Sequence, residues 1–395
     1  MVEITEFVEN RISERAELSA AWWAVVIRFL LHGLIASTWV SRIPAIQTTL
    51  GLSNASLGLC LLGTAVGSMV AVPITGWLVT RFGSKRVTTW STVGFCAALI
   101  APSLANNSVA LFAALTIYGT MAGANDVSIN SQAVAVEAAM GAPTMSRFHA
   151  MFSIGGMAGA TFGAVVAAHN VVPRVHLGIS SAFFLIVSAA TAPLLLEAND
   201  NARTQPTRLR LKRIPAVLVS LTAIGFCMFL CEGAIADWAA VYLKQVLLAG
   251  AGMSAIGYAA FSAGMAIFRL LGDIVTKRLG AVLTLRSGAW LAAIGLTAAL
   301  AAHSPSWALP GFALTGAGFS VVVPLVFAAG GRLNSVPRGA GIAMVTGSGY
   351  IGFLFGPPLI GLLAEVTSLR AALFLVVALS LLAAALANAV RGAED

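Results

Sequence analysis

Long blocks of apolar residues dominate this sequence and leave few folds open to it. Twelve such blocks, each about twenty residues or longer, are separated by mostly short polar connections. An α-helix rises about 1.5 Å per residue, so such a block crosses the roughly 30 Å hydrocarbon core of a bilayer. Only 10% of the residues are charged, against about 25% in ordinary soluble domains. Short segments of alternating polarity, typical of membrane barrels, are absent. The sequence therefore predicts an all-α membrane protein.

The apolar blocks predict twelve transmembrane helices, at residues 21–41, 55–79, 87–105, 109–136, 148–170, 176–195, 215–243, 253–276, 282–302, 307–329, 340–364 and 369–390. One connection is long, polar and basic, and it separates six spans from six. We therefore expect an N-terminal segment at 1–20, a six-helix bundle at 21–195, a linker at 196–213, a second bundle at 214–390 and a tail at 391–395.

The positions of the basic residues predict the orientation of the chain. If the N-terminus is cytoplasmic, sixteen of the 23 Lys and Arg residues fall on the cytoplasmic side. The opposite side then holds only Arg42, Arg174, Lys244 and Arg370. Positive residues concentrate on the cytoplasmic side of membrane proteins, so we expect both termini in the cytoplasm of a cell with an inner membrane. The formal charge of +8 thus reflects topology and predicts no nucleic-acid partner.

The first twenty residues and the four cysteines carry less information. The N-terminal segment contains five Glu residues among its first seventeen positions, which a signal peptide would not have. A short interfacial helix and a polar tail both fit it. All four cysteines lie in apolar blocks, and Cys227 and Cys231 have no flanking His or Cys. We interpret the cysteines as packing residues and expect neither a disulfide framework, nor a metal, nor a cofactor.

Similar stretches recur six spans apart, which indicates duplicated halves. Span 5 reads SIGGMAGATFGA and span 11 reads GSGYIGFLFGPP, with three glycines in register. Spans 1 and 7 align Trp39 with Trp238, and the loops after spans 2 and 8 read TRFGSKR and TKRLGAV. Such pseudo-symmetry is common in secondary transporters, whose binding sites lie between the repeats.

These features together resemble the major facilitator superfamily over nearly the whole chain. The loop GWLVTRFGSKR resembles the family signature G-x-L-x-D-R-x-G-R-[KR], with matches at Gly76, Leu78, Arg81, Gly83 and Lys85 and departures at Thr80 and Ser84. The loop of the second half keeps Arg269 and Asp273, which lie one turn apart. The resemblance implies two pseudo-symmetric six-helix bundles whose loops lock the cytoplasmic helix ends, with Gly76, Arg81, Gly83, Lys85, Arg269 and Asp273 forming this cytoplasmic gate.

Three further stretches resemble a narrower bacterial branch related to the fucose–proton symporters. They are SRIPAIQ after span 1, GTMAGANDVSINSQAVAVE in span 4 and GYIGFLFGPPLIG in span 11. The resemblance places an acid on helix 4, which is Asp126 here. The acid that the symporters carry on helix 1 has no counterpart around Trp39 and Val40, so the sugar substrate does not follow.

Asp126 is the strongest candidate for a functional group inside the membrane. A charge there costs about 2.5–3.5 kcal/mol on insertion scales, so an intramembrane acid usually has a task. Gly119, Gly123, Asp126 and Asn130 recur at helical spacing and share one face of span 4. The glycines allow close helix approach. We predict that Asp126 couples protons to transport; a structural role, paired with Arg28 or capping a broken helix, and direct substrate contact are the alternatives.

Other polar residues inside the spans are weaker candidates. Glu232 in span 7 is a second candidate for proton or substrate contact, with a structural ion pair as the alternative, and we expect Asp237 near the rim of the membrane. In span 1, Arg28 and His32 share one helix face. Arg28 either extends to the cytoplasmic surface or points inward toward Asp126 or an anionic substrate. His32 either carries a proton or forms a neutral hydrogen bond.

We expect the substrate path to be lined by polar and aromatic side chains that suit sugar-like solutes, or else these residues merely pack. With Arg28, they are Trp39, Asn125, Asn130, Gln132 and Tyr350. The leading hypothesis is a monomeric secondary transporter that moves a small polar solute by proton-coupled symport. Proton-driven efflux by antiport and a non-transporting membrane receptor are the alternatives. No nucleotide-binding loop and no hydrolase motif is present, so an enzyme is not expected.

Overall fold

The computed structural model describes residues 2–141, 144–197, 215–333, 336 and 340–393, and within them side chains from residue 15 to 391. Twelve helical segments among these residues are long and apolar enough to cross a membrane, which confirms the predicted number. The first half contains α1 (Val2–Val40), α2 (Ile43–Leu50), α3 (Asn54–Phe82), α4 (Ser84–Ala98), η1 (Ala101–Leu104), α5 (Ser108–Met140), α6 (Met145–Ala168), α7 (Pro173–Thr191) and η2 (Ala192–Leu194). The second half contains α8 (Ala216–Gln245), α9 (Ala251–Leu279), α10 (Ala281–Ala301), α11 (Pro305–Phe319), α12 (Val322–Arg332), α13 (Ala340–Val366), α14 (Leu369–Ala385) and η4 (Leu386–Ala393).

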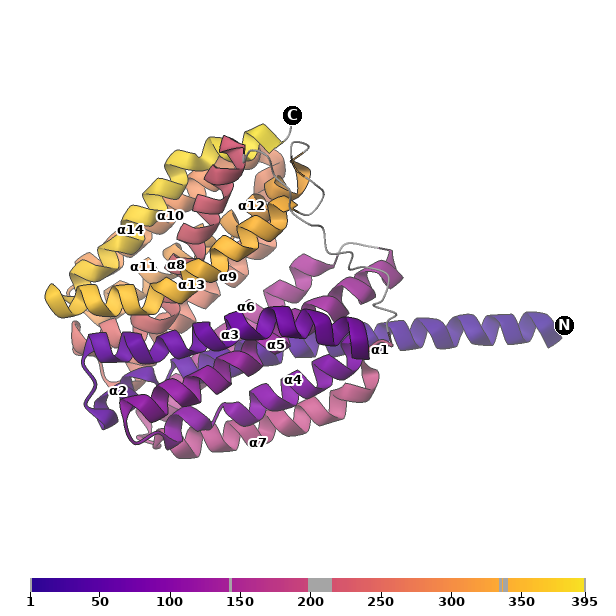
Figure 1. The fold of residues 1–395 in the computed structure, drawn as a ribbon, viewed down its shortest axis with the longest axis horizontal. Helices are drawn as coiled ribbons and strands as arrows, with labels where there is room; N and C mark the ends of the chain where they lie inside the picture. The colour runs from indigo at the N-terminus through magenta and orange to yellow at the C-terminus, as the bar shows by residue number, and fades with distance from the viewer. Residues whose placement is uncertain (1, 142–143, 198–214, 334–335, 337–339, 394–395) are drawn as a thin grey trace.

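The helices form two bundles that correspond to the two halves of the chain, shown from indigo to pink and from pink to yellow in Figure 1. Within the first bundle α3 packs on α5 and α1 packs on α6, while α13 packs on α8 and α10 on α11 in the second. The most extensive contacts between the bundles are those of α6 with α9 and of α3 with α13, and α2 also packs on α8. The predicted linker 196–213 lies almost entirely outside the described residues, and the predicted domain boundaries stay a prediction.

Prolines explain why two of the spans are interrupted. Pro102 has no N–H to donate to the carbonyl of Ala98, where α4 ends and the short helix η1 takes over. Pro324 likewise cannot donate to the carbonyl of Ser320, and the break between α11 and α12 falls at this point. By contrast, the first 32 residues contain neither proline nor glycine. The predicted N-terminal segment is accordingly continuous with the first span in the single helix α1, instead of forming a separate element.

Glycines bring α3 and α5 into backbone contact, as the span 4 glycines predicted. A Cβ atom added to Gly119 would lie 2.0 Å from the carbonyl oxygen of Thr64, and one added to Gly123 would lie 2.7 Å from the Cα of Ser68. The Ser68 hydroxyl donates to the Gly119 carbonyl across this contact at 2.8 Å. Without a hydrophobic driving force between helices in lipid, such close packing and interhelical hydrogen bonds supply much of the association.

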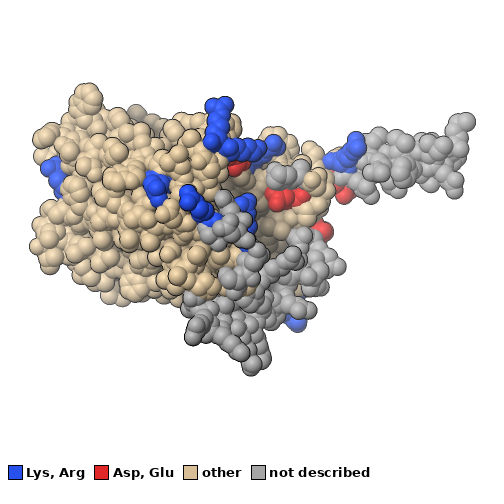
Figure 2. Space-filling view, turned by 90° about the horizontal axis from the view of Figure 1, so that it is seen from above, with Lys and Arg blue, Asp and Glu red and all other residues tan. Residues whose placement is uncertain are grey.

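The outer surface suits a lipid environment. On α7, Ile179, Phe183 and Ile186 are 67%, 58% and 68% exposed and recur at helical spacing, which makes one continuous apolar stripe. Such stripes are unfavourable in water but match hydrocarbon. On the face shown in Figure 2, Lys and Arg gather toward the end from which α1 projects, while the opposite end is mostly uncharged. The cytoplasmic position of the termini stays a prediction that this distribution supports.

Candidate functional site

The two halves contact each other toward one end of the molecule. We call the end where α1 begins and η4 ends the terminal end, and the end where α1 meets α2 the far end (Figure 1). At the far end, Lys244 Nζ on α8 donates to Thr48 Oγ1 on α2 at 2.8 Å. Beside it, Gln245 Nε2 donates to Gln47 Oε1 at 3.0 Å. We refer to Gln47, Thr48, Lys244 and Gln245 as the far-end clamp.

Glycines close the far end between α3 and α13. A Cβ added to Gly58 would lie 2.7 Å from the carbonyl oxygen of Pro357, and one added to Gly361 would lie 3.1 Å from the Cα of Gly58. The backbone N–H of Ala55 also donates to Glu365 Oε2 across this contact at 3.2 Å. The hydrogen bonds that join described residues of the two halves all lie at this end or in the middle part of the helices. The halves are therefore closed at the far end.

Asp126 lies where the middle of the first half faces the second half. Its carboxyl Oδ1 accepts a hydrogen bond from Asn130 Nδ2 at 3.2 Å, and its backbone carbonyl accepts from the same nitrogen at 2.8 Å. The Tyr350 hydroxyl, on α13 of the second half, interacts with this carboxyl. Asp126 and Tyr350 lie 224 positions apart in the sequence (350 less 126), yet the fold brings these two predicted site residues together.

A second polar group bridges the halves through Arg269. Its Nη1 on α9 donates to Ser153 Oγ on α6 at 3.1 Å. Glu232 on α8 and Tyr258 on α9 interact electrostatically with this guanidinium. Arg269 and Asp273 are both predicted residues of the cytoplasmic gate, and no ion pair joins them among the described residues; their part in the gate stays a prediction. Arg269 instead donates to Ser153 of the first half, while Glu232, which interacts with the same guanidinium, belongs to its own half.

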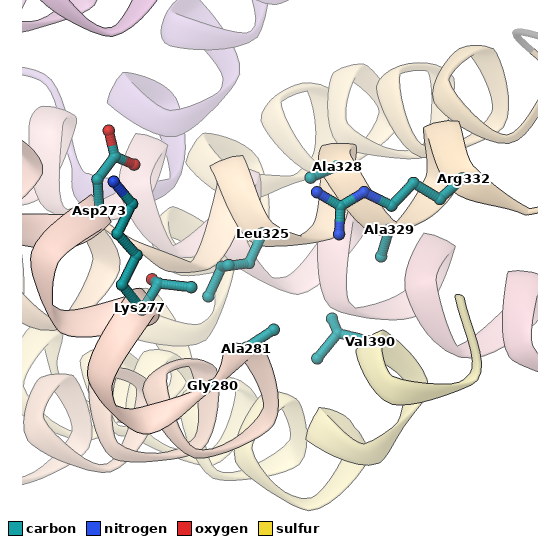
Figure 3. Close-up of a pocket in the computed structure, with 10 residues that line it drawn as sticks. Asp273, Lys277, Gly280, Ala281, Leu325, Ala328, Ala329, Arg332 and Val390 are labelled. Carbon is teal, nitrogen blue, oxygen red and sulfur yellow. The ribbon is translucent and has the colours of Figure 1, made fainter. Parts of the chain in front are cut away.

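Asp273 is exposed and lines a pocket at the terminal end of the second half (Figure 3). The pocket has a volume of about 320 Å³ and also receives Lys277 and Arg332, with Leu325 and Val390 on its apolar sides. Its lining residues come from α9, α10, α12 and η4, all in the second half. The pocket is therefore a side pocket of one bundle, separate from the contact between the halves.

His32 and Asn125 are bonded to each other inside the first half. Asn125 Nδ2 donates to His32 Nδ1 at 2.8 Å, and Asn125 Oδ1 accepts from Thr92 Oγ1 at 2.6 Å. An amide nitrogen only donates, so the histidine nitrogen that receives this bond carries no proton. The His32 ring packs against Phe95 and Phe152, with centroids 5.0 and 5.5 Å away. This geometry corresponds to the neutral, hydrogen-bonded alternative for His32.

Three more predicted substrate residues are engaged within the first half. Arg28 is fully buried and donates to the hydroxyl of Ser188 at 2.5 Å and to its carbonyl at 2.8 Å. It therefore neither extends to the surface nor pairs with Asp126, because α7 offers nearer acceptors. Gln132 Nε2 donates to the Leu196 carbonyl at 2.9 Å. Trp39 is 3% exposed and packs near Tyr118, with ring centroids 6.2 Å apart.

In the described part of the chain, the contacts of Arg81 and Lys85, two predicted gate residues of the first half, lie within that half. Gly83 ends α3 at a φ of +81°, where glycine is favoured. Arg81 lies 5.9 Å from the centroid of the Phe82 ring, and Lys85 forms an ion pair with Glu197 at 3.3 Å. A Cβ on Gly76 would have no neighbour within 4 Å. Among the described residues, Arg81 and Lys85 of this loop are thus engaged within the first half while the far end is closed.

Several interface residues were not predicted as functional from the sequence. Glu365 and Lys244 lie at the ends of their spans, where solvated charges are ordinary, so their positions gave no signal. Asp237, which is expected near the rim of the membrane, lies two turns before the end of α8 and interacts with Tyr118 and Tyr258. These missed residues share one feature: each is a polar residue within about two turns of the end of its span. This feature indicates a contact between the halves only once it is known which spans pack against each other.

Comparisons with known proteins agree with this architecture. A family model described as the Major Facilitator Superfamily matches residues 24–335 and 258–394. An uncharacterized MFS-type transporter of Yersinia pestis is 34% identical over 365 residues, covering 92% of this chain and 94% of that protein. An uncharacterized transporter of Sinorhizobium fredii is 34% identical over 95% of this chain and 99% of its own length. The membrane protein MosC of Rhizobium meliloti is 33% identical over 91% of this chain and 88% of its own.

Solved structures show the same fold at low sequence identity. A bacterial homolog of the human lysosomal transporter Spinster, in an inward-facing and unoccupied conformation, superposes with a TM-score of 0.74 at 15% identity. That comparison covers 95% of this chain and 97% of the other. The nucleoside transporter NupG gives a TM-score of 0.66 at 14% identity, covering 94% of this chain and 98% of the other.

Proposed function

Because the chain belongs to the major facilitator superfamily of membrane transporters, we propose that it carries a small polar organic solute by alternating access, coupled to protons through Asp126. Its twelve apolar helices and its bacterial relatives make it a multi-pass protein of the inner membrane. In this proposal both termini lie in the cytoplasm, and the far end faces outward. In this proposal the solute and the proton both bind and leave in the space between the two bundles.

The contact between Asp126 and Tyr350 carries the proposal. The two side chains come from different halves, so any rotation of one half against the other changes the surroundings of the carboxyl. A group whose surroundings differ between two conformations binds protons with different affinity in each. Proton binding then biases the conformational equilibrium, which is what coupling requires. Asn130, which donates from one turn away on the same helix, stays with Asp126 in both states.

Two unpacked glycines indicate where the terminal end closes in the other state. A Cβ on Gly76 of α3 or on Gly347 of α13 would meet nothing within 4 Å, although both helices pack through glycines at the far end. In the proposal these two surfaces approach each other when the far end opens. Gly76 then acts as part of the cytoplasmic gate, together with Arg81, Gly83 and Lys85.

The substrate site in this proposal lies between the halves, near Glu232 and Arg269. A carboxyl, a guanidinium and the Tyr258 hydroxyl together offer both donors and acceptors, which suits a sugar-like or other polar metabolite. His32, Asn125, Gln132, Trp39 and Arg28 are engaged within the first half in the far-end-closed state, so the proposal gives them no contact with substrate in that state. Symport is favoured over efflux by antiport because Asp126 matches the helix 4 acid of the symporter branch.

The test begins with a thermal-shift screen of the purified protein against sugars, sugar acids, nucleosides, amino acids and common drugs. The ligand that raises the melting temperature is then used in proteoliposomes with an imposed pH difference. For one proton per substrate, one pH unit supports about a tenfold concentration ratio of substrate. Asp126→Asn should reduce this ratio to about one while leaving equilibrating flux, because a neutral amide cannot exchange a proton.

Glu17→Gln is the matched control, because Glu17 is an exposed acid near the start of the first span. It should keep the wild-type ratio. Accumulation driven by inward proton flow supports symport, and proton-driven exit of substrate supports antiport. If Asp126→Asn still accumulates substrate about tenfold, the coupling assignment is refuted. Ligand binding without any flux would identify a receptor.

A further inference from the structure

A buried arginine–histidine pair lies at the far end of the first half. Arg42 precedes α2 and is 3% exposed, and His176 in the first turn of α7 is also 3% exposed. Arg42 Nε donates to His176 Nδ1 at 2.8 Å. Because a guanidinium only donates, the Nδ1 atom that accepts this bond must be unprotonated. The pair therefore exists only while the imidazole is neutral.

No acid balances this cation among the described residues, whose one ion pair lies elsewhere, between Lys85 and Glu197. Arg42 Nη2 and His176 Nε2 are both buried without a hydrogen-bond partner. The histidine is thus the one side chain bonded to Arg42 within the described part of the chain. A buried cation with so few partners is costly, so its position depends strongly on this bond.

The other elements around His176 bring no further charge to it. From α6, the Phe162 ring lies 5.8 Å away, centroid to centroid, while His169 at the end of the same helix is exposed and bonded to the Val165 carbonyl. On α7 itself, Arg174 is exposed. Also packed on α7 is α1, which carries Arg15 and Glu17 toward the terminal end, Arg28 bonded to Ser188 and His32 bonded to Asn125. The other neighbours are α4, which carries charge only at Lys85 and Arg86 in its first turn at the terminal end, and η1 and η2, which carry none.

Arg42 is directly connected to the closed far end through α2. Its carbonyl accepts the first two backbone hydrogen bonds of that helix, from Ala45 and Ile46 at 3.1 Å each. The next residues along α2 are Gln47 and Thr48 of the far-end clamp. A displacement of Arg42 therefore moves the segment that holds α8.

We propose that His176 is a second proton-binding site of this protein, and that its protonation releases Arg42 and opens the far end. The protonated ring has a hydrogen on Nδ1, which faces the Nε–H of Arg42, so two donors and two positive charges meet where one bond stood. The conformation with the closed far end cannot contain the protonated histidine. The conformation with the open far end, in which α2 is displaced, can.

The direction of the pH effect follows from this exclusion. Protons bind the open conformation and not the closed one, so lowering the pH favours opening. A solvated histidine has a pKa of about 6.5. One such group gives about a tenfold rise in the ratio of open to closed molecules between about pH 7.5 and about pH 5.5. With the proposed orientation, an acidic exterior prepares the protein to receive solute from outside.

The experiment uses the full chain in lipid nanodiscs with spin labels at Thr49→Cys on α2 and Val366→Cys on α13. Both positions are exposed at the far end on opposite halves, and the four native cysteines are buried. Double electron–electron resonance then measures the closed and open populations as the pH is lowered. The labelled protein should show the tenfold rise. His176→Gln should not, because glutamine Oε1 accepts from Arg42 without titrating.

A second variant keeps the test decisive if His176→Gln is poorly folded. Arg42→Gln can accept from a protonated His176 or donate to a neutral one, so it should also flatten the response. His169→Gln, at the neighbouring exposed histidine, should respond like the labelled parent protein. Asp126→Asn should retain the tenfold part of the response that depends on His176, which separates this site from the proposed coupling acid. A pH-insensitive parent, a full response in His176→Gln, or a response lost only in Asp126→Asn would each overturn the proposal.

Discussion

Gly58 offers a direct way to shift the balance between the two conformations. A Cβ at this position of α3 would lie 2.7 Å from the Pro357 carbonyl oxygen and 3.2 Å from the Cα atoms of Pro358 and Gly361. All three neighbours belong to the backbone of α13, which cannot rotate away as a side chain can. Gly58→Ala therefore forces the two helices apart only in the conformation whose far end is closed.

The size of the effect follows from these distances. Ordinary van der Waals contact begins at about 3.4 Å, so α3 and α13 must separate by about 0.7 Å. One extra methyl in a packed contact costs about 1–3 kcal/mol. Each 1.4 kcal/mol is about a factor of ten in an equilibrium constant. We therefore expect the ratio of open to closed far ends to rise about 5- to 150-fold.

Spin labels at Thr49→Cys and Val366→Cys report this ratio directly. Gly347→Ala is the matched control, because it lies on α13 but a Cβ there would meet nothing within 4 Å. It should leave the far-end-closed population unchanged or increase it, since it opposes closure of the terminal end in our proposal. A distance distribution of Gly58→Ala identical to that of the labelled parent would show that this glycine contact does not hold the far end closed.

Two more substitutions test separate parts of the account. Lys244→Ala removes the bond to Thr48, a partly exposed contact of about 0.5–1 kcal/mol, and should raise the ratio of open to closed far ends roughly two- to fivefold, measured with the same spin labels. Lys277→Ala, at the terminal end, is its control. An unchanged ratio in Lys244→Ala would show that the far-end clamp does not stabilise the closed far end. Arg28→Met replaces a buried cation that has no acidic partner with an apolar side chain of similar length, so the melting temperature and substrate accumulation should both be retained. Accumulation lost at unchanged melting temperature would instead assign Arg28 to the substrate.

Helix number, repeat symmetry and the close packing of the span 4 glycines could be predicted because they depend on local pattern. Hydrocarbon thickness fixes how many apolar residues a span needs, and a glycine next to another helix is informative wherever it occurs. Asp126 and Tyr350 were selected as polar residues deep in apolar spans, and the fold places them against each other. Polar groups are costly in lipid, so each one inside a span is informative, while the functional roles of these two residues stay a prediction.

Pairings between helices could not be predicted in the same way. Arg269 lies one turn from Asp273 in the sequence, yet its hydrogen bond goes to Ser153 in the other bundle. Arg28 likewise bonds to Ser188, 160 positions later. Which acceptor a long side chain reaches depends on how helices from distant parts of the chain are rotated, and hydropathy contains no information on that rotation. Lys244 and Glu365 were missed for the same reason.

The central claim is that one carboxyl between the halves gains and loses a proton as the protein changes conformation. Infrared difference spectroscopy of the protein in lipid, stepped between acidic and neutral pH, measures the carbonyl band of a protonated buried carboxyl group without needing the substrate. The account predicts such a band in the wild-type protein and in Glu17→Gln, and its loss in Asp126→Asn. A band of undiminished amplitude in Asp126→Asn would place the titrating carboxyl elsewhere and contradict the coupling mechanism.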